Sequence, residues 1–144
     1  MTEVNIARYA NQEILSSVNH LLPQLSSSAA PLTLERLKDL LDSSAITLFI
    51  ATHEDRTIGM LTLAIFPLPT GIRAWIEDVV VDSGARRLGV GELLTTTAME
   101  HANRAGATTV DLTSRASREA ANSLYRKLGF VQRETNVYRW RSVE

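Results

Sequence analysis

The stretch that decides the predicted fold is WIEDVVVDSGARRLGVGE, residues 75 to 92. The valine run at 79–81 is β-branched and predicts a strand, which the polar residues 82–84 bring to an end. The arginine pair at 86–87 comes next, and Gly89-Val90-Gly91 then opens an amphipathic segment typical of a helix. A strand, a basic glycine-rich turn and a helix N-terminus in this order predict a receptor for an anion.

The physical reason lies in the backbone at the start of the helix. The first N–H groups of a helix have no partner within it, and the helix dipole adds positive potential at the same end. Gly89 and Gly91 have no Cβ, so phosphate oxygens can approach the main chain closely. Arg86 and Arg87 add charge and planar hydrogen-bond donors. The stretch therefore predicts a phosphate-bearing ligand, and a pyrophosphate suits it best.

Composition limits the class of protein. A chain of 144 residues is expected to form one domain, and 15 basic against 16 acidic side chains give no general attraction to nucleic acid or to an anionic membrane. The chain has no cysteine, which excludes a disulfide scaffold and a cysteine nucleophile. The three histidines, His20, His53 and His101, share no metal-ligand spacing, so no metal is expected. Without a signal sequence or a membrane-spanning run, we expect a cytoplasmic protein.

Hydrophobic periodicity predicts an α/β or α+β single domain, with a mixed sheet and helices on both faces. Asn11 and Thr33 are expected to cap the first two helices, with Pro23 kinking or ending the first of them. A third helix is expected from Gly91 to Gly106, and a fourth from Ser117 to Leu128. The expected strands are Val4 to Tyr9, Ile46 to Thr52, Thr57 to Phe66, Trp75 to Val81, Thr108 to Thr113, Phe130 to Arg133 and Val137 to Arg141.

Two motifs in this order carry a family resemblance. Arg86-Arg87-Leu88-Gly89-Val90-Gly91 fits a Gln/Arg-x-x-Gly-x-Gly/Ala signature, and Tyr125-Arg126-Lys127-Leu128-Gly129-Phe130 fits a late helix ending Tyr-x-x-x-Gly-Phe. Together they make the chain resemble the GNAT superfamily of acyl-CoA-dependent N-acyltransferases. The resemblance implies one N-acetyltransferase domain over residues 1–144. It further implies a mixed, mostly antiparallel sheet of about seven strands, splayed between the fourth and fifth, with about four helices.

The resemblance also implies acetyl-CoA as co-substrate. Its pyrophosphate would lie on the glycine-rich turn and its pantetheine arm along the fourth strand, where the splay exposes backbone. One departure is Arg118, where many relatives have asparagine; either Asn122 replaces that asparagine or Arg118 contacts a phosphate. The expected cofactor contacts are Val79, Val80, Val81, Arg86, Arg87, Leu88, Gly89, Val90, Gly91, Glu92 and Asn122.

Acetyl transfer to an amine requires a base, a donor to the developing oxyanion and an acid for the leaving thiolate. Tyr125 is the expected acid; the alternative is a core aromatic. The base is Glu77 or Asp78, unless each acid merely pairs with an arginine. In an unbulged strand Glu77 shares a face with Val79 and Val81 and is preferred, whereas a bulge would exchange the faces and favour Asp78.

These residues predict an N-acetyltransferase that acts on a primary amine of a small molecule by direct attack in a ternary complex. One alternative is acetylation of a protein N-terminus or lysine, and the near-neutral charge does not separate the two. An alternative of another class is an acyl-CoA-binding module without turnover, which Tyr125 and the acids on the fourth strand argue against. No nucleic-acid or membrane partner is expected. Small members of the family often pair, so a homodimer is a further expectation.

Overall fold

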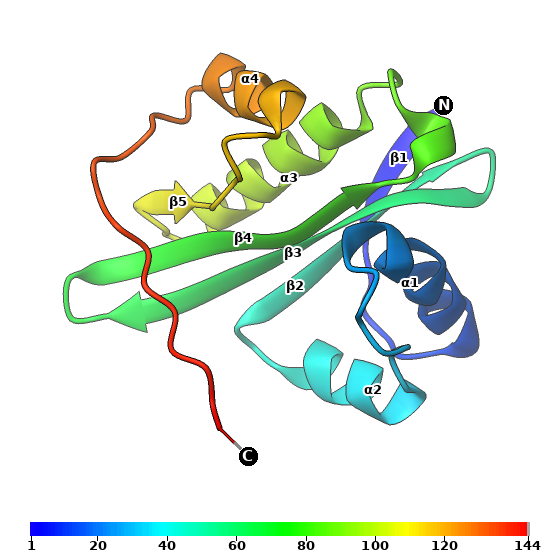
Figure 1. Ribbon diagram of the computed structural model, residues 1–144. Coiled ribbons are helices and arrows are strands. Elements are labelled where there is room, and N and C mark those ends of the chain that lie inside the picture. Colours follow the sequence, from blue (N-terminus) through cyan, green and yellow to red (C-terminus); the bar gives the residue numbers. More distant parts are fainter. Residues whose placement is uncertain (144) are drawn as a thin grey trace. The chain divides into compact units, whose positions relative to one another are not determined.

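The computed structural model describes residues 1–143, and Figure 1 shows how their helices and strands are arranged. The chain divides into two compact units, Met1–Thr113 and Ser114–Glu144. The first unit contains the whole sheet and three of the α-helices, and the second contains the last helix and the C-terminal tail. Each unit is described by itself below.

The first unit is built on a five-stranded sheet with the order β1-β2-β3-β4-β5. The first four strands pair antiparallel and β4 pairs parallel with β5, which confirms the predicted mixed, mostly antiparallel sheet. The strands are β1 (Thr2–Ile6), β2 (Ile46–His53), β3 (Arg56–Leu68), β4 (Gly71–Val81) and β5 (Thr109–Asp111).

Helices cover both faces of this sheet (Figure 1). The helices α1 (Gln12–Leu25) and α2 (Leu34–Asp42) lie on one face, and α3 (Val90–Arg104) lies on the other. Both predicted N-caps are confirmed. The Asn11 side chain accepts the Ile14 N–H at 2.8 Å, and the Thr33 hydroxyl accepts the Arg36 N–H at 3.2 Å. Pro23 lies in the last turn of α1, which ends at Leu25.

Two layers of apolar side chains hold the helices to the sheet. Under α1 and α2, Leu21 and Leu37 are fully buried in one cluster with Met60 and Val80. On the opposite face, the ring of Phe49 makes an edge-to-face contact with His101 of α3, with centroids 5.6 Å apart. Alternate residues of a strand face opposite layers, so this division fixes which β4 side chains face which helices.

The second unit contains α4 (Glu119–Lys127), followed by an extended tail. Gly129 adopts a φ of 99° just after the helix, as predicted for a terminating glycine. The predicted strands from Phe130 to Arg133 and from Val137 to Arg141 are wrong, since neither segment forms a strand. Apolar alternation makes a strand only where a neighbouring backbone completes the ladder, and Tyr138 and Trp140 are instead 88% and 83% exposed. The described chain thus has five strands in place of about seven.

Candidate active site

The fourth strand is bulged at the two candidate carboxylates. Thr62 of β3 pairs with Glu77, and Met60 pairs with Val80, so β4 contains one residue more than β3 in this interval. Asp78 takes up the irregularity with a φ of 51°, a left-handed conformation that Asp tolerates better than most residues. The preference for Glu77 assumes a strand without a bulge, and that prediction is therefore wrong.

The bulge changes which side chains share a face. Glu77 lies on the same face as Val80, because their partners Thr62 and Met60 are alternate residues of β3. That face is the one covered by α1 and α2, since Val80 belongs to their apolar cluster. Val81 pairs with Gly59 on the face covered by α3, so it does not share a face with Glu77. Both carboxylate residues, Glu77 and Asp78, are exposed.

The pairing between β4 and β5 stops early. It covers only Arg73 with Thr109, Ala74 with Val110 and Trp75 with Asp111, while β4 continues to Val81. Within residues 1–143, no strand pairs with the rest of this edge of β4. The backbone at 76–81 therefore presents hydrogen-bonding groups that an extended ligand could use, as expected of a splay.

The residues that follow β4, 82–89, form what we call the cofactor turn. A short 3-10 helix, η1 (Ser83–Ala85), begins it, and Arg86, Arg87, Leu88 and Gly89 are exposed. Gly89 is the N-cap of α3 with a φ of 72°, and its carbonyl accepts the first helical bond, from the Leu93 N–H at 3.0 Å.

The geometry of Gly89 suits a bulky anion. A Cβ placed on Gly89 would meet no atom within 4 Å, so open space lies in front of the helix N-terminus. The guanidinium groups of Arg86 and Arg87 form no ion pair within residues 1–143 and can turn toward a ligand. A diphosphate fits such a site, since the N-terminus of α3 and the two cations both favour negative charge.

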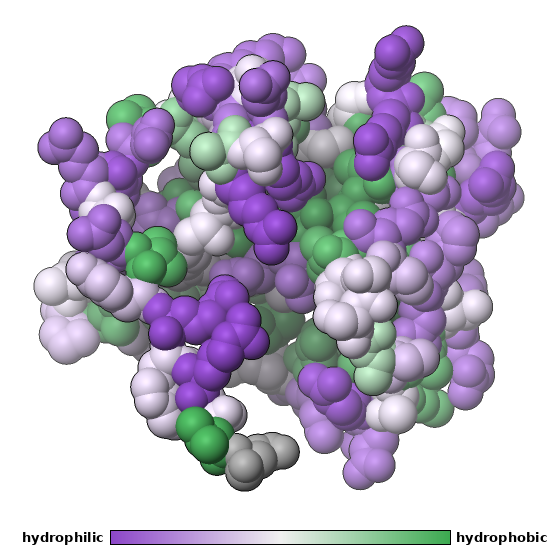
Figure 2. Space-filling view, viewed as in Figure 1, coloured by the Kyte–Doolittle hydropathy of each residue, from purple (hydrophilic) through white to green (hydrophobic). Residues whose placement is uncertain are grey.

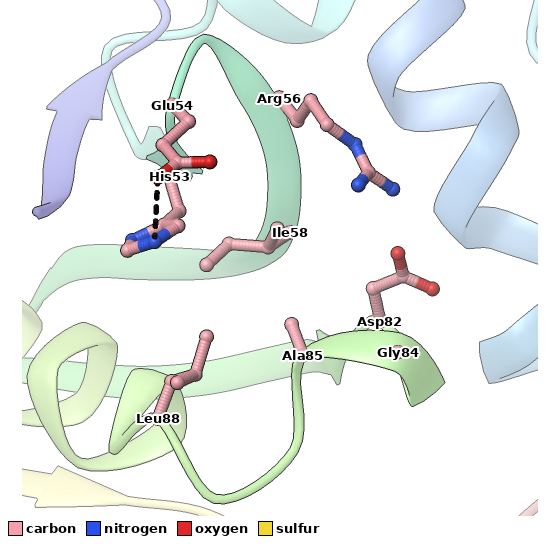
Figure 3. Close-up of a pocket in the computed structure, with 8 residues that line it drawn as sticks. All are labelled: His53, Glu54, Arg56, Ile58, Asp82, Gly84, Ala85 and Leu88. Atoms are coloured by element: carbon pink, nitrogen blue, oxygen red, sulfur yellow. Dashed lines mark ion pairs between the residues drawn. The ribbon is translucent and has the colours of Figure 1, made fainter.

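The side of the cofactor turn that faces the β2–β3 hairpin differs from the open side at Gly89 in the space that it offers a ligand. It closes a hollow of about 90 Å³ lined by residues that include Arg56, Asp82, Ala85 and Leu88 (Figure 3). In Figure 3 the side chains of Arg56 and Asp82 point toward one another, while Leu88 and Ala85 lie on the same side of the hollow as Asp82, across from Ile58. Sites for small molecules usually span roughly 300 to 1,000 Å³. The hollow is too small for a nucleotide cofactor, so the open side at Gly89 is the candidate binding face.

Asp82, the first residue of the turn, is held by two side chains of α1. Gln24 Nε2 donates to Asp82 Oδ1 at 2.9 Å, and His20 Nε2 lies 3.6 Å from Asp82 Oδ2. The Gln24 bond is the largest cause that lowers the Asp82 pKa below 3.8, and it outweighs the burial that would raise this pKa. Neither Gln24 nor His20 can be placed beside Asp82 from the sequence, because both are far from it along the chain.

Gly59 of β3 also helps to position the site, and the sequence patterns did not identify it. A Cβ at this position would lie 3.0 Å from Val90 Cγ1, 3.1 Å from Leu94 Cδ1 and 3.2 Å from the Val80 carbonyl oxygen. The first turn of α3 therefore packs directly on the β3 backbone. An isolated glycine inside a predicted strand was the available signal for this close approach.

The second unit contains Asn122 and Tyr125, both half-buried on α4. Asn122 Nδ2 donates to the Arg115 carbonyl at 2.9 Å, so this amide holds the segment before the helix. The Tyr125 ring packs edge-to-face on Phe130 at a centroid distance of 5.7 Å. Burial raises the pKa of Tyr125 above 10.0, and the positive charge of Arg118 acts in the opposite direction. At neutral pH the phenol is a proton donor.

The structure thus groups the predicted site residues in two sets. Glu77, Asp78, the valines at 79–81 and the cofactor turn are consecutive along the chain of the first unit, while Asn122 and Tyr125 belong to the second. In the described part of the chain, no three His, Asp or Glu side chains are arranged to hold a metal ion. No helix among residues 1–143 is long and apolar enough to cross a membrane.

Comparison with known proteins shows the family to which this chain belongs. Residues 14–130 match the acetyltransferase (GNAT) family. That match spans most of the chain, and the protein belongs to this family. It is therefore a GNAT N-acetyltransferase family enzyme, and this family uses acetyl-CoA. No curated protein sequence matches the chain.

Solved structures agree with this fold. A protein of Agrobacterium tumefaciens str. C58 that carries an acetyltransferase assignment is 26% identical, with a TM-score of 0.86 over 96% of this chain and 99% of its own. The aminoglycoside acetyltransferase meta-AAC0020 of an uncultured soil metagenomic sample, in complex with sisomicin, is 18% identical, with a TM-score of 0.87 over 99% and 97%. Aminoglycoside N-acetyltransferase AAC(6')-Iy, in complex with CoA, is 16% identical, with a TM-score of 0.83 over 99% and 96%.

Proposed function

We propose that the protein transfers the acetyl group of acetyl-CoA to a primary amine of a small molecule, by direct attack in a ternary complex, and that residues 1–144 form one catalytic domain. The observation that carries the proposal is the early end of the β4–β5 pairing at Trp75. The unpaired edge of β4 leads directly into the cofactor turn and the N-terminus of α3. A pantetheine arm along the strand would therefore bring the diphosphate to Gly89.

The cofactor contacts follow from this path. The main chain of Val79, Val80 and Val81 offers hydrogen bonds to an extended arm, as an added strand would. The N–H groups from Arg87 to Glu92 and the guanidinium groups of Arg86 and Arg87 favour the diphosphate charge. Asn122 uses one amide N–H on the Arg115 carbonyl, so its second N–H and its amide oxygen are left for the cofactor.

When bound, acetyl-CoA supplies the acetyl group as a thioester. A carboxylate at the β4 bulge removes a proton from the ammonium form of the acceptor, and the amine nitrogen then forms the new C–N bond. A backbone N–H of residues 79–81 donates to the carbonyl oxygen as that oxygen gains negative charge. Tyr125 gives its phenol proton to the sulfur as the C–S bond breaks. As the amide forms, its nitrogen loses a second proton to solvent, and the carboxylate releases the first one to solvent. Solvent returns one proton to Tyr125, so the enzyme ends in its starting state and one proton is released in each turnover.

Glu77 is the proposed base. It lies on the sheet face that α1 and α2 cover, and helices between the first two strands are the natural elements to select an acceptor. Asp78 is the second candidate, because the bulge is the condition that favours it. Two exposed carboxylates beside each other also attract a cationic amine, whichever of them takes the proton.

A panel of acceptors tests this function. The purified protein would be incubated with acetyl-CoA and separate polyamines, amino acids, aminoglycosides and basic peptides, with release of free CoA thiol as the readout. Turnover with a small amine, and intersecting initial-rate lines when both substrates are varied, are the expected results. Parallel lines would contradict direct attack, and turnover confined to peptides would assign the protein-acetylating alternative.

A further inference from the structure

We propose that Gln24 is a positioning residue for acetyl-CoA, because its side-chain amide joins α1 to the first two residues of the cofactor turn, Asp82 and Ser83. Both ends of the amide are used. Gln24 Nε2 donates to Asp82 Oδ1 at 2.9 Å, and the Ser83 N–H donates to Gln24 Oε1 at 2.9 Å. The inference rests on the proposed position of the diphosphate at this turn.

The turn has few other anchors. Ala85 is buried, and so is Val90 just after the turn, but Ser83, Gly84 and residues 86–89 are exposed and pack against little. A segment with so little buried surface is held mainly by its hydrogen bonds. The bonds to Gln24 are therefore a large part of what keeps the turn in one conformation before the ligand arrives.

Asp82 connects the side-chain bonds to the backbone of the turn. Its N–H donates to the Ile58 carbonyl of β3 at 2.7 Å, and its own carbonyl accepts the Ala85 N–H at 2.9 Å. Asp82 thus joins the end of the sheet to η1. Its side chain is only 11% exposed and faces His20 at 3.6 Å. A buried carboxylate is destabilised when it loses a hydrogen-bond donor. A change at Gln24 therefore destabilises the start of the cofactor turn directly.

The amide of Gln24 and the carboxylate of Asp82 can be exchanged between the two positions by substitution. Gln24→Glu keeps an oxygen for the Ser83 N–H, but places a second carboxylate against Asp82. In the double variant Gln24→Glu/Asp82→Asn, the new amide can donate to the carboxylate at position 24, so that this bond forms with donor and acceptor exchanged, while the Ser83 N–H still donates to residue 24. Gln12→Glu makes the same change of charge at the exposed first residue of α1 and serves as the matched control.

The experiment measures acetyl-CoA binding by calorimetry, together with kcat, KM and Tm, for these three proteins and for Gln24→Ala. We expect Gln24→Glu to weaken acetyl-CoA binding by about tenfold and to change kcat at saturation by less than about twofold. The double variant should recover most of the affinity, Gln24→Ala should show a smaller loss than Gln24→Glu, and Gln12→Glu should bind as the unaltered protein does.

Two results would overturn the inference. One is unchanged acetyl-CoA affinity in both Gln24→Glu and Gln24→Ala. The other is a loss of acetyl-CoA affinity in Gln24→Glu that the added Asp82→Asn change does not restore. The loss would then not depend on the contact between residues 24 and 82. A Gly89→Glu protein measured in parallel separates this failure from a failure of the proposed cofactor position. If Gly89→Glu also binds normally, the diphosphate does not lie at the turn at all.

Discussion

A tyrosine that acts as an acid must keep its proton until the leaving sulfur takes it. Burial raises the pKa of Tyr125, so the phenol stays protonated through neutral pH and loses its proton only above the ordinary value of 10.0. The proposed acid is therefore active over the whole neutral range, and the activity that depends on it should fall only at strongly alkaline pH.

Replacing Tyr125 with phenylalanine tests this role. The ring contact with Phe130 does not need the hydroxyl, so Tyr125→Phe should fold normally. We expect kcat to fall by about a hundredfold, with acetyl-CoA affinity nearly unchanged. Steady-state kinetics and calorimetry on the same preparation would measure both quantities. An unaltered kcat would mean that solvent or another group protonates the thiolate.

The two carboxylates at the bulge can be separated by matched amide substitutions. Asp78→Asn keeps a residue that tolerates the φ of 51°, and Glu77→Gln keeps the length of an exposed side chain, so neither change should disturb β4. We expect Glu77→Gln to lower kcat by about a hundredfold at neutral pH, with partial recovery as the pH rises and more amine is unprotonated. Asp78→Asn should keep the pH profile of the unaltered enzyme. A lower kcat in Asp78→Asn, together with an unchanged pH profile in Glu77→Gln, would make Asp78 the base.

At the scale of elements, the position of α3 depends on the absence of a side chain. Gly59→Ala would place a methyl group 3.0 Å from Val90 Cγ1 and 3.2 Å from the Val80 carbonyl oxygen, and the backbone atom cannot rotate away. We expect the free energy of unfolding to fall by about 1–3 kcal/mol as the first turn of α3 is displaced.

Urea unfolding, followed by circular dichroism, would measure this change. Gly84→Ala is the control, because a Cβ at Gly84 meets no atom within 4 Å, and its free energy of unfolding should stay close to that of the unaltered protein. Displacement of α3 also moves the N–H groups at its N-terminus, so Gly59→Ala should bind acetyl-CoA more weakly. Equal stability of the two variants would show that α3 does not pack on Gly59 as described.

The elements also show what the sequence can predict. Asn11, Thr33, Gly106 and Gly129 act on backbone groups within a few residues, and the helix ends expected from them are found. The bulge at Asp78 depends on how β4 aligns with β3, and the bonds of Gln24 join residues separated by 58 positions. Local patterns contain no information on such alignments, so the face of Glu77 and the role of Gln24 required the structure.

At the scale of the whole molecule, the largest difference from the sequence prediction is the tail. The sequence predicts strands at Phe130 to Arg133 and Val137 to Arg141, but Val131, Val137, Tyr138 and Trp140 are exposed in the structure. Figure 2 shows one face of the protein, on which hydrophilic residues predominate. Tyr138 and Trp140 of the tail are both exposed. The chain has two tryptophans, half-buried Trp75 in β4 and exposed Trp140 in the tail, and they allow a direct test.

We expect Trp75→Phe, which leaves Trp140 as the only tryptophan, to show red-shifted emission that iodide quenches strongly. Trp140→Phe should show bluer emission with weaker quenching, because Trp75 is half-buried. Stern–Volmer measurements on both variants would give the accessibility of each ring. A protected Trp140 would show that the tail packs in solution, as the sequence pattern suggested.

The central claim is that the diphosphate of acetyl-CoA lies in front of Gly89. It is tested most directly by calorimetric titration of acetyl-CoA into Gly89→Glu and Gly89→Lys. Both variants place a long side chain at a φ of 72°, so they share the backbone strain and differ in charge. The account predicts that Gly89→Glu binds at least about a hundredfold more weakly than Gly89→Lys, with a difference that shrinks as salt is added. Equal affinities for the two variants, both close to that of the unaltered protein, would contradict it.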